Sequence, residues 1–270
     1  MKLIRNIFAM AVLGTAGVAN ASLIDVGGVT WDPSYVRPAS PPFVSEETDL
    51  IQKISFNQWF VDSADAGTID TSKAISPAAV TAGDELQAIG TMTYFNGLVD
   101  PEAFPGPVGF CIGCEVTFRF TGLLADGLGG FTTAVGGAFV EFFVETAGDV
   151  DQLYSGTGVP WLTLEVDEIT FNADNPTSGS EYNGGNIQLA LSAVGGPAAS
   201  NFDTNTITNA SGGLSDVFYN ADAIFDVANG NFFAAGTGDL VGDTIPEPGS
   251  IAVLGLGLLA LAGIRRKKRG

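Results

Sequence analysis

The feature that most constrains the fold of this chain is a two-residue alternation of apolar and polar side chains in several short stretches. A period of two places alternate side chains on opposite faces of a β-strand, and no stretch between the two ends keeps a long helical period. The clearest alternation runs from Trp161 to Phe171 and changes phase at Asp167–Glu168, which indicates a β-bulge. Its apolar positions are Leu162, Leu164 and Val166, and its polar positions are Thr163, Glu165 and Asp167.

Further strand candidates occupy residues 50–60, 85–95, 115–120, 138–146, 187–194 and 216–227. Residues 232–239 are interpreted as the end of a strand that runs into a Gly–Asp turn. With 36 Gly and 19 Phe, the composition favours strands joined by turns around an aromatic core. We therefore expect an all-β body of about eight to ten strands, folded as an antiparallel β-sandwich of jelly-roll type.

The first 21 residues have the three parts of a secretory signal peptide. Lys2 and Arg5 form a basic start, residues 7–18 are apolar, and Ala19 and Ala21 are the small residues of an A-x-A cleavage site. We expect cleavage after Ala21 and export of the protein. A lipoprotein signal would require a cysteine after the apolar run, and none follows it in this sequence.

The last 26 residues, 245–270, also have three parts. Pro246, Glu247 and Pro248 come first, and the two prolines mean that a helix begins only after Pro248. The apolar run 251–264 is about 21 Å long as a helix, which is short for a hydrocarbon core of about 30 Å. A basic cluster follows and is expected on the cytoplasmic side. It consists of Arg265, Arg266, Lys267, Lys268 and Arg269.

In composition, order and terminal position, this tail resembles the PEP-CTERM sorting signal of Gram-negative bacteria. The resemblance implies that an exosortase, a membrane cysteine protease, cuts near the motif and releases or transfers the body. It also implies a host that makes exopolysaccharide, and it concerns the export route rather than the activity of the body. The expected organisation is a signal peptide at 1–21, an exported acidic β-rich domain at 22–244 and a sorting tail at 245–270 with one short transmembrane helix.

Residues 22–244 are strongly acidic, because their four basic and 29 acidic residues give a formal net charge of −25. Such a surface repels nucleic acids and anionic lipid, so we expect no nucleic-acid partner and membrane contact only through the unprocessed tail. The chain also contains no histidine. This excludes Ser-His-Asp and Cys-His triads, histidine-ligated zinc and the C-x-x-C-H haem signature.

Cys111 and Cys114 form a C-x-x-C pattern. In an exported chain a structural disulfide is the simplest interpretation. A redox site is the alternative, but it needs a helix N-terminus to lower a thiol pKa, whereas residues 116–120 have a strand pattern. A metal site is a third interpretation, although two thiolates do not complete a zinc shell.

Two segments are rich in oxygen ligands and are interpreted either as surface loops or as calcium sites. The first contains Asp149 and Asp151 with Gln152 and Ser155, in a spacing that does not match an EF-hand. The second contains Asn172, Asp174, Asn175 and Glu181. Calcium is the one cofactor that these patterns suggest, and otherwise we expect none.

Paired carboxylates raise the hypothesis of a glycoside hydrolase, which needs two of them in one cleft. The pairs are Glu141 with Glu145 and Glu165 with Asp167. A chain with 29 acidic residues in its body produces such pairs by chance, so we expect that the protein is not an enzyme. Three tryptophans could stack on sugars, but we expect core packing for at least two of them. They are Trp31, Trp59 and Trp161.

The expected function is structural or adhesive, at the cell surface or in an extracellular matrix, in contact with exopolysaccharide of a biofilm or floc. This expectation rests on the resemblance of the tail. A calcium- or carbohydrate-binding module is the first alternative, and it predicts a higher melting temperature with its ligand. A carboxylate-dependent polysaccharide hydrolase is the second, and it predicts that turnover disappears when one Asp or Glu is replaced by its amide.

Overall fold

The computed structural model describes seven parts of the chain: residues 23–37, 46–47, 49–99, 109–146, 160–173, 182–225 and 232–245. The expected signal peptide, with Ala19 and Ala21, lies outside the described residues. The tail from Pro246 onward, including its basic cluster, lies outside them as well. The description that follows therefore concerns the exported body.

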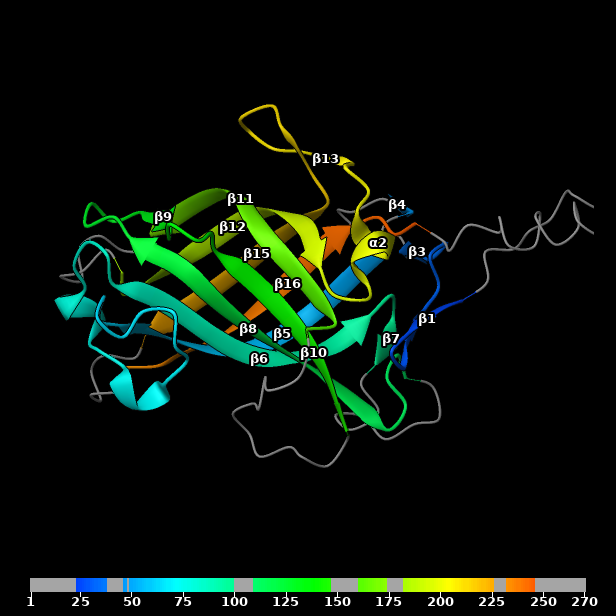
Figure 1. Cartoon of the computed structure of the whole chain (residues 1–270), viewed down its shortest axis with the longest axis horizontal. Coiled ribbons are helices and arrows are strands. Elements are labelled where there is room, and N and C mark those ends of the chain that lie inside the picture. The colour runs from blue at the N-terminus through cyan, green and yellow to red at the C-terminus, as the bar shows by residue number, and fades with distance from the viewer. Residues whose placement is uncertain are drawn as a thin grey trace, which may run out of the picture.

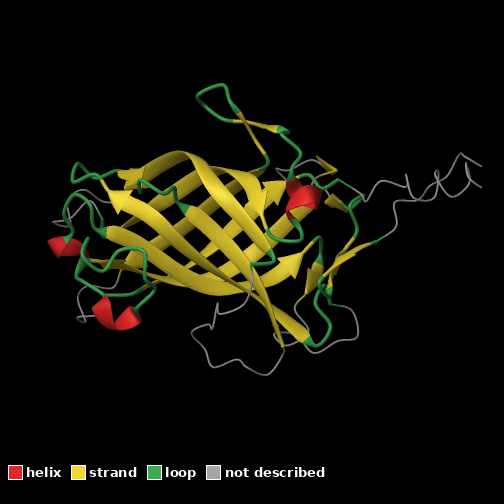
Figure 2. Ribbon diagram, in the orientation of Figure 1, coloured by secondary structure: helices red, strands yellow, loops and turns green. Residues whose placement is uncertain are grey.

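The described residues are organised almost entirely as β-strands (Figures 1 and 2). The long strands are β5 (Asp49–Val61), β6 (Glu85–Phe95), β8 (Cys114–Ala125), β10 (Phe139–Thr146), β11 (Leu162–Ala173), β12 (Gly184–Gly195), β15 (Val217–Phe225) and β16 (Ala234–Gly242). The short strands are β1 (Ile24–Val26), β2 (Val29–Trp31), β3 (Val36–Arg37), β4 (Glu46–Glu47), β7 (Leu98–Val99), β9 (Phe131–Thr133), β13 (Ile207–Thr208) and β14 (Leu214–Ser215). The helical turns are η1 (Thr71–Lys73), η2 (Pro77–Ala79) and α2 (Ala199–Phe202).

The eight long strands form a closed antiparallel β-barrel. Their order is β6-β5-β16-β15-β12-β11-β10-β8, and β8 pairs back with β6 from Glu85↔Leu124 to Thr91↔Thr117. The expected β-sandwich is therefore wrong. Strand alternation predicts that one face is buried, which holds for sandwiches and barrels alike, whereas the β6–β8 pairing that closes the sheet is a tertiary contact.

Most strands lie where the alternation placed them. The structure confirms all seven predicted segments, and it confirms the bulge, because the β11–β12 register shifts between Val166 and Glu168. The interpretation of residues 232–239 is wrong, since Gly238 and Asp239 lie inside β16 at a register shift against β5. A strand of Ala and Gly carries little apolar signal, so only its pairing partners reveal it.

The interior of the barrel is a packed core rather than a channel. Every long strand contributes inward side chains that are almost fully buried, among them Phe118, Phe142, Leu164 and Leu189. Eight strands give an interior just wide enough for such side chains to fill. Tyr219 also points inward from β15, and its burial, with the charge of Asp239 as the second cause, raises the pKa of its phenol above the usual value.

Aromatic clusters close the barrel at its two ends. At the end near β9, the rings of Phe60 and Phe131 stack at 6.2 Å, and Phe225 and Tyr182 pack beside them. At the other end, β1, β2 and α2 cover the opening (Figure 1). Their cluster is centred on Trp31 and also contains Phe95, Phe110, Trp161 and Phe202.

Candidate functional site

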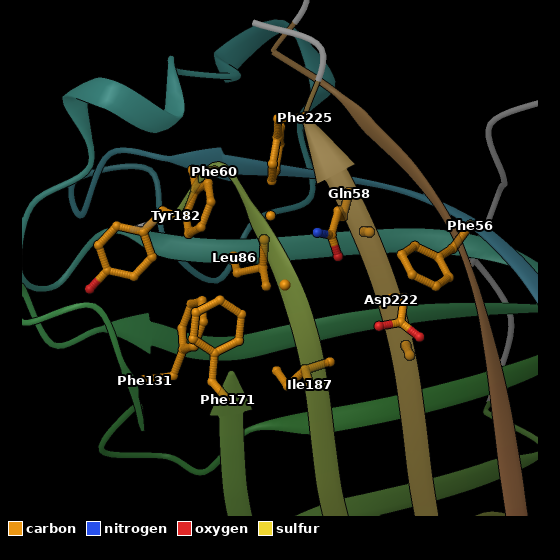
Figure 3. Close-up of a pocket in the computed structure, with 14 residues that line it drawn as sticks. Phe56, Gln58, Phe60, Leu86, Phe131, Phe171, Tyr182, Ile187, Asp222 and Phe225 are labelled. Atoms are coloured by element: carbon orange, nitrogen blue, oxygen red, sulfur yellow. The ribbon is translucent and has the colours of Figure 1, made fainter. Parts of the chain in front are cut away.

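A pocket opens among the aromatic residues at the β9 end of the barrel (Figure 3). Phe60, Phe131 and Phe171 point into it from different strands, and Gln58 reaches it from β5. Its volume is about 20 Å³, which is room for a single water molecule. The described side chains therefore fill most of this end of the barrel.

The loop that borders this pocket is fixed by one carboxylate and one phenol. The carboxylate of Asp126 accepts hydrogen bonds from the backbone N–H groups of Leu128 (2.7 Å) and Gly130 (2.9 Å). These bonds lower the pKa of Asp126. The Tyr182 hydroxyl accepts from Gly127 N–H at 3.1 Å, and burial raises its pKa. These interactions serve the structure of the loop.

A larger cavity of about 150 Å³ lies on the outer wall of the barrel, and we call it the outer groove. Its floor consists of outward side chains from three neighbouring strands: Glu168 and Thr170 of β11, Gln188 and Ala190 of β12, and Phe218 of β15. Its other side is residues 207–210 of the β13–β14 hairpin, which projects from the barrel (Figure 1).

The β-bulge in β11 determines how the hairpin is attached. Because one extra residue enters β11 there, Asp167 and Glu168 both face the outer surface. The Asp167 carboxylate accepts hydrogen bonds from the hydroxyls of Ser192 (2.7 Å) and Ser215 (2.6 Å), and Ser215 belongs to the hairpin. Glu168 accepts the backbone N–H of Ser211 at 3.3 Å. Two adjacent acids of one bulge therefore hold the hairpin over the groove.

A buried aspartate fixes the base of the same hairpin. Asp216 is 2% exposed, and its carboxylate accepts three backbone N–H groups. The donors are Thr204 at 2.8 Å, Asn205 at 2.6 Å and Ala193 at 2.7 Å. Since Ala193 lies in β12 and the other two lie in the chain that leads to the hairpin, Asp216 ties the hairpin to the barrel wall.

The outer groove combines an aromatic side chain with unsatisfied polar groups. Within the part of the chain that the structure describes, the Thr170 hydroxyl and the Gln188 amide have no hydrogen-bond partner. Thr170 of β11 and Gln188 of β12 are direct cross-strand partners. Phe218 of β15 is the cross-strand partner of Ala190, which lies two residues after Gln188 on the same face of β12. The groove therefore offers an apolar surface flanked by donors and acceptors.

Sequence reasoning missed these groove residues. Phe218, Gln188 and Thr170 are ordinary outward positions of three separate strands, and none of them belongs to a motif. The change of phase at Asp167–Glu168 was the one available signal, and it marked the bulge without showing what the bulge holds.

The predicted disulfide is present. Cys111 and Cys114 are bonded across a tight turn, with their Cα atoms 5.1 Å apart and Gly113 at a φ of +73°. Cys114 begins β8, and Cys111 forms a β-bridge with Val29 of the β1–β2 hairpin. The bond thus fastens the turn that enters β8, and the described chain has no free cysteine.

The acidic pairs of the hydrolase hypothesis lie on the outer wall. Glu141 and Glu145 are four residues apart in β10, a separation of about 13 Å along a strand, which exceeds the carboxylate spacing of glycosidases. Glu141 forms an ion pair with Arg119 at 2.6 Å. Asp167 holds the hairpin, and Glu165 faces Phe139 and Ser192 across the sheet. Neither pair lines the outer groove.

All three tryptophans are buried, which confirms core packing for them. Trp31 and Trp161 are 0% and 2% exposed and belong to the cluster at the α2 end. Trp59 points outward from β5 but is covered, because it belongs to a small apolar cluster against which Ile69, Ala74 and Phe233 pack. None of these rings is free to stack on a sugar.

The calcium hypothesis concerns residues that the structure mostly does not describe. Asp149 and Asp151 lie outside the described residues, as do Asp174, Asn175 and Glu181. Within the described ranges, no group of three or more Cys, Asp or Glu side chains is arranged to hold a metal ion. The hypothesis therefore stays a prediction.

Fold and site together define an acidic β-barrel with a polar groove on its outer wall. No curated protein and no solved structure matches the chain. The family model of the PEP-CTERM protein-sorting motif matches residues 244–267, so this is a PEP-CTERM protein. The motif identifies an exported, exosortase-targeted protein of the cell surface or extracellular space, and it assigns no family to the barrel. No helix in the described part is long and apolar enough to span a membrane, and the expected tail helix lies outside that part.

Proposed function

We propose that the barrel is a structural or adhesive component of the cell surface or matrix and that it binds neutral polysaccharide in the outer groove. The observation that carries this proposal is the position of Phe218 beside the Gln188 amide and the Thr170 hydroxyl, which have no hydrogen-bond partner among the described residues. The export route supports it, because the sorting motif delivers the barrel to the compartment where such polysaccharide is found.

The chemistry of a sugar fits the groove. A pyranose ring has an apolar C–H face and a rim of hydroxyl groups, so it is held by an aromatic ring on one side and by amides and hydroxyls at its edge. Phe218 provides the ring, while Gln188 and Thr170 provide the edge contacts. Asn209 adds an amide from the hairpin, although its oxygen already accepts Gly213 N–H at 2.7 Å.

Charge selects the kind of polysaccharide. With a formal net charge of −25 in residues 22–244, the body repels polyanions such as alginate. A neutral chain meets no such barrier. We therefore propose neutral exopolysaccharide as the partner of the groove.

Binding rather than hydrolysis suits the acidic groups of the groove. Glu168 is the single carboxylate among the described residues that line the groove, and it already accepts a hydrogen bond from the hairpin. Glycoside hydrolysis by the usual route needs two carboxylates on the two sides of the bond. The proposal therefore includes no catalytic step, and it needs no cofactor.

The test is co-sedimentation of the mature protein with the neutral exopolysaccharide purified from its host. We expect Phe218→Ala to weaken binding about tenfold, which corresponds to about 1.4 kcal/mol. Ile224→Ala is the matched control, because Ile224 is an outward apolar residue of the same strand, is 68% exposed and lies outside the groove. Equal binding by both variants and the wild type would overturn the groove assignment. Stronger retention on alginate than on the neutral polymer would contradict the charge argument.

A further inference from the structure

The last two described residues of the chain are fastened to the body of the barrel. The Thr244 hydroxyl accepts a hydrogen bond from the indole N–H of Trp31 at 3.1 Å, and Thr244 is 8% exposed. Ile245 donates its backbone N–H to the carbonyl of Asn201 at 2.7 Å and accepts the Asn201 side-chain amide at 3.2 Å. We call this arrangement the tail clamp, and it immediately precedes Pro246 of the sorting motif.

The two residues that hold the tail are themselves rigidly placed. Trp31 is 0% exposed, and its ring lies 5.2 Å from Phe95 and 5.8 Å from Phe202. Asn201 is 6% exposed and lies in α2, next to Phe202. The clamp therefore belongs to the aromatic cluster that closes this end of the barrel.

The clamp joins parts of the chain that are distant in sequence. Trp31 comes from the N-terminal hairpin, Asn201 from the connection between β12 and β15, and Thr244 from the segment after β16. Trp31 and Thr244 are 213 residues apart. The three parts meet only when the barrel has closed, so the clamp forms only in the folded body.

A protease must draw several residues of its substrate away from the folded body before it can cut them. A segment that is buried and hydrogen-bonded is cut only through local opening, at a rate set by the population of the open form. Thr244 is buried and hydrogen-bonded to Trp31. Ile245 is 42% exposed, but its backbone N–H and carbonyl are both hydrogen-bonded to Asn201. The two residues are therefore held to the barrel, although the family match begins at Thr244.

We propose that the tail clamp sets the upstream limit of processing. Trp31 and Asn201 are positioning residues: they keep Thr244 and Ile245 with the barrel, so that cleavage falls after Ile245 and the mature C-terminus stays attached to the barrel end. Removal of the tail then leaves β16 intact. This inference is independent of the polysaccharide proposal, because it concerns where the chain is cut and not what the groove binds.

The experiment measures the C-terminus of the mature protein from its native host by intact mass, before and during digestion with a carboxypeptidase. We expect the wild-type chain to end at or after Ile245 and digestion to stall there. In Asn201→Ala, digestion should proceed upstream of Thr244 on the order of tenfold faster, because the side-chain hydrogen bond to the Ile245 carbonyl that helps to hold the closed form is removed.

Asn186→Ala is the matched control. Asn186 is also an asparagine whose side chain bonds to neighbouring groups, Asn220 at 2.9 Å and Asp222 at 3.1 Å, but it lies on β12 near the opposite end of the barrel. This variant should digest like the wild type. Thr244→Val removes the hydroxyl that accepts the Trp31 hydrogen bond with little change of shape, and we expect it to accelerate digestion as Asn201→Ala does. It provides the test if the Asn201→Ala protein fails to accumulate.

Two results would overturn the inference. One is a wild-type mature chain that ends upstream of Thr244. The other is digestion of Asn201→Ala and Thr244→Val no faster than that of Asn186→Ala. Neither result depends on whether the protein sediments with polysaccharide, so this test and the binding test fail separately.

Discussion

At the scale of single residues, glycines decide where the large side chains of this barrel pack. Phe56 of β5 lies opposite Gly236 on one side and Gly90 on the other, so its inward ring is flanked by glycine on both neighbouring strands. A Cβ at Gly236 would overlap the Phe56 ring and would lie 2.6 Å from the Asp222 carbonyl oxygen. The Phe56 ring occupies the space that the missing side chain of Gly236 leaves, and the Phe118 ring lies beside Gly90.

We predict that Gly236→Ala destabilises the mature protein by about 1–3 kcal/mol, because the added methyl group overpacks the core. Thermal and denaturant unfolding measure the change. Gly136→Ala is the control, since a Cβ at Gly136 meets no atom within 4 Å and its φ is not in the left-handed region. An equal loss in both variants would mean that the close approach to Phe56 has no energetic importance.

At the scale of elements, the β13–β14 hairpin is held by acids rather than by an apolar core. Leu214 in the hairpin is 57% exposed, whereas Asp216 at its base is 2% exposed and accepts three backbone N–H groups. A short two-stranded hairpin is marginally stable by itself. Its position over the outer groove therefore depends on Asp167, Glu168 and Asp216.

We predict that Asp216→Ala lowers the free energy of unfolding by about 3 kcal/mol, because three backbone donors lose their acceptor in a buried place. It should also weaken polysaccharide binding through the displaced hairpin. Asp203→Ala is the control in the same loop, since Asp203 is exposed and, within the described part of the chain, its carboxylate accepts only the Asn205 side-chain amide at 2.9 Å. Denaturant unfolding of the two variants compares them. A decrease of less than about 1 kcal/mol in the free energy of unfolding of Asp216→Ala would mean that water replaces the carboxylate as the acceptor for the three backbone N–H groups.

At the scale of the whole molecule, a closed barrel with a very acidic surface has two opposing properties. Closure gives each of the eight strands a paired neighbour on both sides, which leaves little open edge for pairing with other chains and suits an exported protein. The formal net charge of −25 in residues 22–244 keeps the body soluble, but its like charges also repel one another within the compact state.

We predict that sodium chloride stabilises the mature protein. Raising ionic strength from about 0.01 M to about 0.15 M shortens the screening length from about 30 Å to about 8 Å, which weakens the repulsion. A rise in melting temperature of about 2–4 °C, equivalent to about 1 kcal/mol, is expected in differential scanning calorimetry. Potassium chloride should act equally. An additional rise with calcium chloride at the same ionic strength would identify calcium binding, and no rise with any salt would contradict the argument from charge.

The sequence by itself determined the local features of this protein. Alternation located seven of the eight barrel strands, and the change of phase after Val166 located the bulge, because both are properties of consecutive residues. The pattern around Pro246, Glu247 and Pro248 indicated the sorting tail, which the family match confirms, since a sorting signal is read as linear sequence. The C-x-x-C spacing indicated the disulfide, because its two cysteines are close together in the sequence.

Only the tertiary structure decided closure, the groove and the clamp. The β6–β8 pairing, the meeting of Thr170, Gln188 and Phe218, and the contact between Trp31 and Thr244 all join residues from separate segments. Periodicity states which face of a strand is buried, but the same inward face serves a sandwich or a barrel. Which strands become neighbours depends on the free energy of the whole packed core, and no single stretch of the sequence contains that information.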